Sequence, residues 1–178
     1  MAAAARLVGD GATALVSFGL AGGLDPALRP GMVVVASVVL ADGERLAADA
    51  ALAARFGGVT GHVLLAGAAV VADAAAKQAM FAATGAQAVD LESGAVARIA
   101  STCGLPFAVV RAICDPAERD LPPAALVALD RDGGIAVMAV VRSLVRRPGQ
   151  IFGLLALARD AAVARRALVR LVGDFAAV

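Results

Sequence analysis

The sequence predicts an α/β fold, and two observations carry that prediction. Short runs rich in Val alternate along the chain with longer segments rich in Ala, which is the pattern of strands that alternate with helices. The chain has 178 residues, enough for one domain at about 150 residues per domain, and it shows no internal repeat and no long linker. A domain of this length buries a sizeable core without disulfides or metal ions.

In the first half of the chain, strands are expected where Val and Leu run together and helices where Ala dominates. Gly and Pro residues punctuate these segments and indicate turns. In chain order we expect a helix at 2–8, a strand at 13–17, a glycine-rich loop at 18–24, a strand at 32–40, a helix at 46–55 and a strand at 62–66 that extends toward 71.

The second half continues the alternation and ends in helices. Gly104 follows a helical pattern at the position where helices commonly end, and Arg111 is the one charged residue within an apolar run. We expect helices at 74–83, 92–103, 124–130 and 135–145, strands at 88–91 and 107–113, and a last helix after Pro148-Gly149.

The composition excludes several classes of protein. Hydrophobic residues make up 61% of the chain, but no run reaches the roughly 18 uncharged apolar residues of a membrane-spanning helix. Trp and Tyr are absent, which argues against the aromatic platforms that bind single-stranded nucleic acid. The N-terminus lacks the long apolar core of a signal peptide. We therefore expect a cytoplasmic protein.

The ligands of a metal site are also scarce. Cys103 and Cys114 match no zinc spacing, and His62 is the one histidine. Pairing His62 with either cysteine gives no third group to orient a nucleophile. Residues 130–133 (DRDG) resemble the start of a calcium loop, but Val141 stands at its twelfth position, where a ligand is required. We expect no metal.

The charge is divided unevenly between the two ends of the chain. Residues 1–141 carry nine basic and thirteen acidic residues (−4), whereas residues 142–178 carry seven arginines and two aspartates (+5). Apolar residues recur in this tail at helical spacing. Such a helix either packs one face and solvates the other, or rests its arginines on anionic lipid. No nucleic-acid motif accompanies the arginines, so we expect no nucleic-acid partner.

The glycine-rich segment at 18–24 (FGLAGGL) does not fit a dinucleotide-binding motif. That motif requires a helix after its glycines, whereas Pro26 and Pro30-Gly31 follow here, and then another predicted strand. What remains is a loop whose missing side chains let a small ligand approach the backbone.

Charged residues gather at the ends of the last two predicted strands. Glu92 stands at a strand-to-helix junction, where a helix N-terminus favours negative charge. Arg111, within a buried strand, needs a nearby anion, and Glu92 is the expected partner. Arg111 and Asp115 point to the same side of an extended chain, about 13 Å apart at about 3.3 Å per residue. Simple capping and a structural ion pair are the alternatives to a functional site.

Three blocks of sequence together resemble a known enzyme superfamily. They are residues 19–31 (GLAGGLDPALRPG), 89–93 (VDLES) and 111–115 (RAICD). In this order they resemble the purine nucleoside phosphorylase and methylthioadenosine nucleosidase superfamily, and most closely its hopanoid-associated phosphorylase branch. Residues 147–150 (RPGQ) and 157–161 (LARDA) are similar to the C-terminal tail of that branch.

The resemblance implies a phosphorylase/hydrolase-like, three-layer α/β fold with a central mixed sheet flanked by helices. Residues 1–147 would form this domain, without the first strands that relatives have, and residues 148–178 would form its basic amphipathic tail. The implied reaction is cleavage of the N-glycosidic bond of a 5′-modified adenosine, adenosylhopane, in hopanoid biosynthesis. Adenine is released by phosphorolysis or hydrolysis, with phosphate as the co-substrate in the first case and no cofactor.

The resemblance also implies roles for the charged residues. Asp115 matches the aspartate on the base side, where a general acid contributes roughly 10²–10⁴ in rate. For this the pocket has to raise its pKa from about 3.9; apolar neighbours such as Ile113 act in that direction and Arg111 against it. Glu92 matches the carboxylate that binds the ribose hydroxyls, and Arg111 would orient both acids. The other implied substrate-binding residues are Leu91, Gly19, Leu20, Ala21, Gly22, Val70 and Val71.

The sequence departs from the superfamily pattern at four points. Leu20 replaces a small hydroxyl-bearing residue, Leu91 replaces Met, and Cys114 replaces Ser. The first strands of relatives supply phosphate-binding or water-activating residues, and these have no counterpart here. The alternative to an enzyme is therefore a non-catalytic nucleoside- or lipid-binding protein of the same fold. The expected partners are a lipid-linked nucleoside, a membrane surface beneath the tail at the inner membrane, and a second copy in a homodimer.

Overall fold

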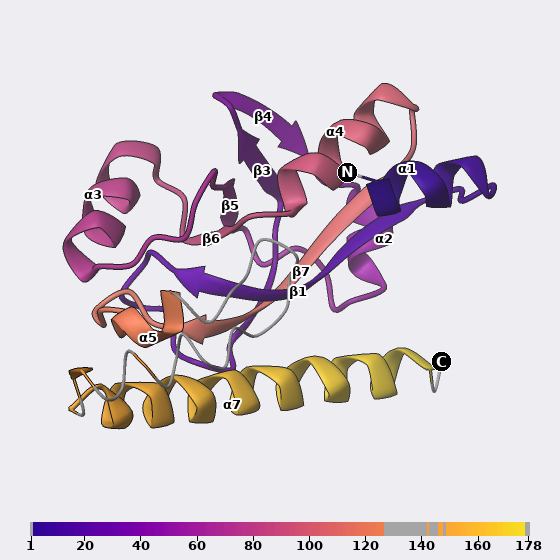
Figure 1. The fold of residues 1–178 in the computed structure, drawn as a ribbon. Coiled ribbons are helices and arrows are strands. Elements are labelled where there is room, and N and C mark those ends of the chain that lie inside the picture. The colour runs from indigo at the N-terminus through magenta and orange to yellow at the C-terminus, as the bar shows by residue number, and fades with distance from the viewer. Residues whose placement is uncertain (1, 127–141, 143–145, 148, 177–178) are drawn as a thin grey trace.

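The computed structural model describes residues 2–126, 142, 146–147 and 149–176. Within them, seven strands form one mixed sheet in the order β2-β7-β1-β6-β5-β3-β4, with helices on both of its faces (Figure 1). The strands are β1 (Leu15–Gly23), β2 (Val33–Val35), β3 (Val38–Ala41), β4 (Glu44–Ala47), β5 (Val63–Ala66), β6 (Ala88–Asp90) and β7 (Phe107–Asp115). The helices are α1 (Ala2–Gly9), α2 (Ala50–Ala54), α3 (Ala74–Thr84), α4 (Ser93–Thr102), α5 (Pro123–Leu126) and α7 (Gln150–Ala176). The predicted α/β fold with a mixed sheet is confirmed.

Strands β1 and β7 run parallel through the middle of the sheet. Their register pairs Leu15 with Phe107 and continues to Gly22 opposite Asp115, with an irregularity after Ala21. The glycine-rich segment predicted as a loop at 18–24 is therefore mostly strand. The loop prediction was wrong because hydrogen bonds to β7 hold this backbone extended although its side chains are small.

The predicted strand at 32–40 is split in two because the sheet curls. β2 pairs with β7, whereas β3 pairs with β5. Between them, Ala36 N donates to Val109 O of β7 (3.0 Å), and the next amide, Ser37 N, donates to His62 O beside β5 (2.9 Å). The chain thus passes from one part of the sheet to another within two residues.

The predicted helix at 46–55 was too long. Residues 44–47 form strand β4 opposite β3, and the helix begins only after Asp49, whose carboxylate accepts from Leu52 N (2.6 Å). The predicted helix at 124–130 is described only at its start, in α5, and the predicted helix at 135–145 lies outside the described residues apart from position 142.

Helices α1 and α4 lie on one side of the β1–β7 pair and α7 on the other (Figure 1). Small residues let α4 approach closely: Ala97 and Ala100 are fully buried, and a Cβ on Gly94 would lie 2.6 Å from Ala66 Cβ. On the opposite face, Ala164 and Leu168 of α7 pack into a cluster with Val35, Val110 and Ala112. Strand β7 is therefore buried along both faces, which explains its nearly continuous apolar run.

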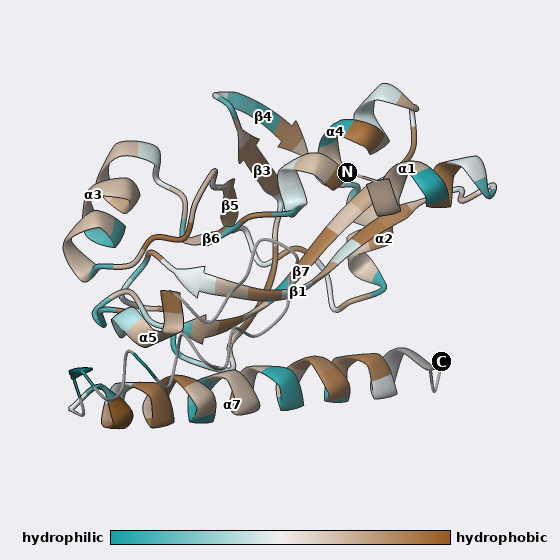
Figure 2. Ribbon diagram, in the orientation of Figure 1, coloured by the Kyte–Doolittle hydropathy of each residue, from teal (hydrophilic) through white to brown (hydrophobic). Residues whose placement is uncertain are grey.

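Hydrophobic and hydrophilic stretches follow one another along α7 (Figure 2). None of the described helices is both long enough and apolar enough to cross a bilayer.

Candidate active site

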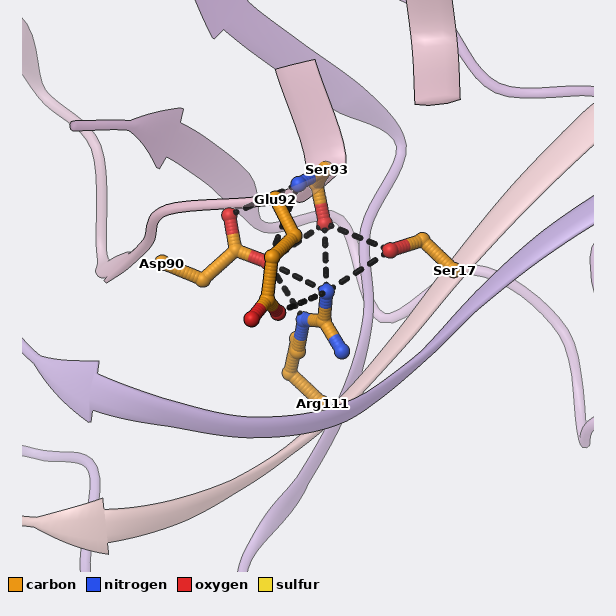
Figure 3. A network of polar contacts seen from close by, with 5 residues as sticks. All are labelled: Ser17, Asp90, Glu92, Ser93 and Arg111. Atoms are coloured by element: carbon orange, nitrogen blue, oxygen red, sulfur yellow. Dashed lines mark hydrogen bonds and ion pairs between the residues drawn. The ribbon is translucent and has the colours of Figure 1, made fainter. Parts of the chain in front are cut away.

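Arg111, in the middle of β7, is completely buried and is the centre of a polar cluster (Figure 3). Its guanidinium is paired with Asp90, at the end of β6, through Nη2 and through Nε (2.6 Å). Nη2 also donates to Ser17 Oγ (2.7 Å) and Ser93 Oγ (3.0 Å), and Ser93 Oγ donates to Asp90 Oδ2 (2.6 Å). A buried charge is tolerated only when it is paired and hydrogen-bonded, and this cluster satisfies both conditions.

Glu92 is a secondary partner of Arg111, and this corrects the expectation that it would be the main one. Its Oε2 lies 3.6 Å from Arg111 Nη2, and its side chain is 79% exposed. Asp90 occupies the near position because residues 90 and 92 flank the turn into α4 and only the first is still within the strand. The carboxylate of Glu92 therefore lies at the solvent-exposed edge of the cluster, where a ligand can reach it.

Asp115, at the end of β7, is held by Lys77 of α3 and not by Arg111. Lys77 Nζ lies 2.7 Å from Asp115 Oδ2, and the two side chains are 1% and 9% exposed. The expectation that Arg111 would orient both acids is therefore wrong for Asp115. Within the described residues, the other oxygen of this carboxylate, Oδ1, is buried and has no hydrogen-bond partner.

Burial raises the pKa of the Asp115 carboxyl above its usual value of 3.8. The hydrogen bond and charge of Lys77, and the charge of Arg119, act in the opposite direction but do not cancel the effect of burial. A general acid requires a raised pKa, and the pKa of Asp115 is raised. The cations that lower it are Lys77 and Arg119, whereas the sequence had suggested Arg111.

Two predicted glycines adjoin these charged groups. A Cβ on Gly19 would lie 2.5 Å from Arg111 Nη1, so only glycine leaves room for the guanidinium. Gly22 stands opposite Asp115 in the parallel register, and a Cβ on Gly22 would lie 3.7 Å from Asp115 Oδ2. The missing side chain at Gly19 thus accommodates the protein's own guanidinium group, and Gly22 lies next to the carboxylate of Asp115.

The other predicted site residues lie in the hydrophobic clusters or are partly exposed. Leu20 packs with the cluster on the α7 face, away from Arg111, and Ala21 is buried in the main core. Leu91 and Val70 are about half exposed, and Val71 packs against a cluster that contains Val89.

Four residues in or beside these two ion pairs were not predicted as site residues from the sequence: Asp90, Ser17, Ser93 and Lys77. Ser17 occupies a buried position in an alternating strand, where a polar residue indicates a buried partner. Lys77 gave no such signal because a lysine in an Ala-rich helix is ordinarily solvated.

Cys114 is unsuited to act as a nucleophile. Burial, followed by the charge of Asp115, raises the pKa of its thiol to about 11, so the reactive thiolate is disfavoured. Among the described residues, no three His, Cys, Asp or Glu side chains gather in a way that would hold a metal ion.

The fold and these groups define an α/β protein with two buried ion pairs on β7, one in the middle of the strand and one at its carboxyl end; the first is completed by the end of β6, which runs antiparallel to β1. Residues 49–147 match the phosphorylase superfamily. The chain belongs to this family, and this assigns it to the enzymes that comprise nucleoside phosphorylases and nucleosidases. The matched segment contains Lys77, Glu92, Arg111 and Asp115.

Solved structures share the fold at low sequence identity. The 5′-methylthioadenosine/S-adenosylhomocysteine nucleosidase of Helicobacter pylori is 17% identical over 97% of this chain and 74% of its own, with a TM-score of 0.65. The futalosine hydrolase of H. pylori is 18% identical over 97% of this chain and 73% of its own, with a TM-score of 0.65. The S-adenosylhomocysteine nucleosidase of Streptococcus pyogenes is 23% identical over 89% and 72%, with a TM-score of 0.59. The comparison with curated proteins gave no match.

Proposed function

We propose that the chain cleaves the N-glycosidic bond of a 5′-modified adenosine and releases adenine, with Asp115 as the general acid. The observation that carries the proposal is the geometry of Asp115. Its carboxyl is buried at a strand end, its pKa is raised by burial, and within the described part of the chain Oδ1 has no partner. A buried oxygen without a partner is costly, and the hydrogen bond to a bound base would remove that cost.

In the proposed reaction the C1′–N9 bond breaks and its electron pair remains on the base. The proton of the Asp115 carboxyl passes to a ring nitrogen, so adenine leaves as a neutral molecule. Oxygen of water or phosphate forms the new bond to C1′; a water nucleophile releases one proton to the solvent, and the Asp115 carboxylate regains its proton from the solvent. A general acid of this kind contributes roughly 10²–10⁴ in rate.

Glu92 is proposed to bind the ribose hydroxyls. It is exposed at the edge of the Arg111 cluster. There its negative charge would stabilise the positive charge that develops on the sugar in the transition state. Arg111 acts through Glu92 and is otherwise committed to Asp90 and the two serines.

The substrate is proposed to be lipid-linked, as in adenosylhopane, and α7 supports this. Its inner face is buried at Ala164 and Leu168, yet its outer face exposes the large apolar residues Phe152 (77%), Leu155 (61%) and Val169 (71%). Arg165, Arg166 and other exposed arginines lie among them. Apolar side chains interspersed with arginines fit the headgroup region of an anionic bilayer.

The activity is tested by chromatography of adenine released from 5′-methylthioadenosine, S-adenosylhomocysteine and adenosylhopane, each with and without phosphate. We expect release with wild type and a loss of about 10²–10⁴ in kcat for Asp115→Asn. Full activity of Asp115→Asn would overturn the role of Asp115. Binding of these nucleosides without any release would instead establish the non-catalytic binding protein.

The membrane contact is tested by co-sedimentation with phosphatidylglycerol vesicles and with phosphatidylcholine vesicles. We expect binding to the anionic vesicles alone, weakened in the variant Phe152→Ser/Leu155→Ser. Leu7→Ser, which removes an exposed apolar side chain on α1, is the matched control and should bind like wild type. If α7 instead pairs two copies, sedimentation velocity will show a dimer that the same double variant dissociates; the proposed homodimer otherwise uses another surface.

A further inference from the structure

Lys77 is the one lysine of the chain, whose other fifteen basic residues are all arginines. It lies in the first turns of α3 and is 1% exposed. Buried lysines are rare unless they are paired, so a complete burial of the single lysine calls for a specific role.

The ammonium group of Lys77 has three hydrogen-bond acceptors for its three protons. Nζ lies 2.7 Å from Asp115 Oδ2, and it donates to Pro116 O (3.0 Å) and Arg119 O (2.7 Å). A compact ammonium can reach three acceptors grouped in this way, whereas a planar guanidinium presents its donors in a fixed fork. The contacts therefore specify lysine at this position.

The pairing determines where Asp115 can carry a proton. An ammonium can only donate, so Oδ2 acts as an acceptor toward Lys77 whenever that contact is made. A carbonyl oxygen is a better acceptor than a hydroxyl oxygen, so a proton on the carboxyl is favoured on Oδ1, which is buried and lacks a partner among the described residues. We propose that Lys77 is a positioning residue that reserves Oδ1 as the proton-bearing oxygen and directs it toward the leaving base. This inference rests on the proposed function.

The turn that follows Asp115 is fixed at several points, so the arrangement is preorganised. Ala74 N donates to Asp120 Oδ1 (2.8 Å), and Leu121 N donates to Ala72 O (2.7 Å). These bonds hold the start of α3 against the segment after β7. From the other face of the sheet, Asp160 of α7 pairs with Arg119 (2.5 Å). Fixed geometry of this kind allows one oxygen to be presented repeatedly in the same place.

The first test is the pH dependence of kcat/KM for wild type and Lys77→Met. The wild-type rate falls on the alkaline side as the Asp115 carboxyl loses its proton. Removing the cation beside that carboxyl raises its pKa further, so we expect the alkaline limb of Lys77→Met to move to higher pH. We also expect kcat to fall by up to about 100-fold because the acid is no longer held in place, with a smaller change in KM.

Arg98→Met is the control, since it removes a cation from the exposed pair between Arg98 and Asp42. The alkaline limb of the Arg98→Met pH profile should lie at the same pH as that of wild type. A merely structural Lys77 would lower the yield and the melting temperature of Lys77→Met without moving the limb, and that result would overturn the proposal. If Asp115→Asn keeps full activity, the proposed function fails; if activity depends on Asp115 but the limb stays in place, only this inference fails.

A second measurement does not require Lys77→Met to fold. Because the chain has one lysine, [ε-13C]lysine labelling gives a single side-chain NMR signal. We expect that signal to shift with pH in step with the alkaline limb in wild type, because the charge appears on a carboxyl that touches Nζ, and not to shift over that range in Asp115→Asn. A signal that moves equally in both proteins would overturn the proposal.

Discussion

Strand β7 holds two buried ion pairs four residues apart, Arg111 with Asp90 and Asp115 with Lys77. At Arg111, the guanidinium meets a carboxylate and two hydroxyls, and both oxygens of Asp90 also accept hydrogen bonds from Ser93. At Asp115, Lys77 is saturated by three acceptors, yet Oδ1 of the carboxylate has no partner among the described residues.

This difference indicates that the two ion pairs have different roles, one structural and one chemical. A buried pair whose members are all satisfied stabilises the fold only while it is complete, and losing one member leaves an unpaired charge. A buried pair with one unpartnered oxygen bears a continuing cost, which a bound ligand can remove. By this argument the Arg111 cluster is the support of the site, and the Oδ1 side of Asp115 is where the reacting base belongs.

The largest effect on stability should come from Arg111. We expect Arg111→Met to lower the free energy of unfolding by about 3–5 kcal/mol, since it leaves Asp90 buried without a counter-charge. Arg98→Met, which opens an exposed ion pair, should cost less than about 1 kcal/mol. Urea denaturation followed by circular dichroism measures both. Equal losses in the two variants would remove the distinction between the Arg111 cluster and a surface pair.

Gly19 offers a smaller change to the same cluster. In Gly19→Ala, the new Cβ would lie 2.5 Å from Arg111 Nη1, and the guanidinium cannot move aside without breaking its bonds to Asp90 and Ser17. We expect a loss of about 1–3 kcal/mol in the free energy of unfolding. Gly22→Ala is the matched change on the same strand, because its Cβ would meet only ordinary contacts, at 3.5, 3.7 and 3.9 Å. A Gly19→Ala protein as stable as Gly22→Ala would mean that Arg111 is loosely held.

The sequence predicted the parts of the fold that local patterns determine. Val-rich runs marked β5, β6 and β7, and Gly85 and Gly104 ended their helices with positive φ (66° and 65°). It failed where the sheet decides the structure. The segment at 18–24 carries four small residues and looks like a loop, but β7 alongside it makes it a strand, and the pairing of β2 and β3 with different neighbours is a property of the whole sheet.

The site, like the fold, was predicted in its local features but not in the contacts that depend on tertiary structure. An arginine in a buried strand requires an anion, and the anion is present. Whether Asp90 or Glu92 supplies it depends on where the strand stops and the helix begins, and this position is beyond the resolution of sequence patterns. The role of Lys77 could not be predicted for a different reason. This side chain is buried because the turn after Asp115 lies against α3, and that contact joins residues about forty positions apart.

The smallest predicted effect is a pH dependence that distinguishes Asp115 from the rest of the site. Burial raises the pKa of this carboxyl in the folded protein above the usual 3.8, so the native state binds the proton more tightly than the unfolded chain does. Between the two pKa values the native state holds more protons, and the free energy of unfolding therefore falls as pH rises through that window. One proton contributes at most about 1.4 kcal/mol per pH unit. In Asp115→Asn this contribution disappears, so the variant should gain stability relative to wild type as pH rises from 3.8, measured by urea denaturation at a series of pH values. Parallel curves for the two proteins would show that the unpartnered oxygen carries no cost in the folded state, and would place Asp115 with Arg111 among the satisfied groups.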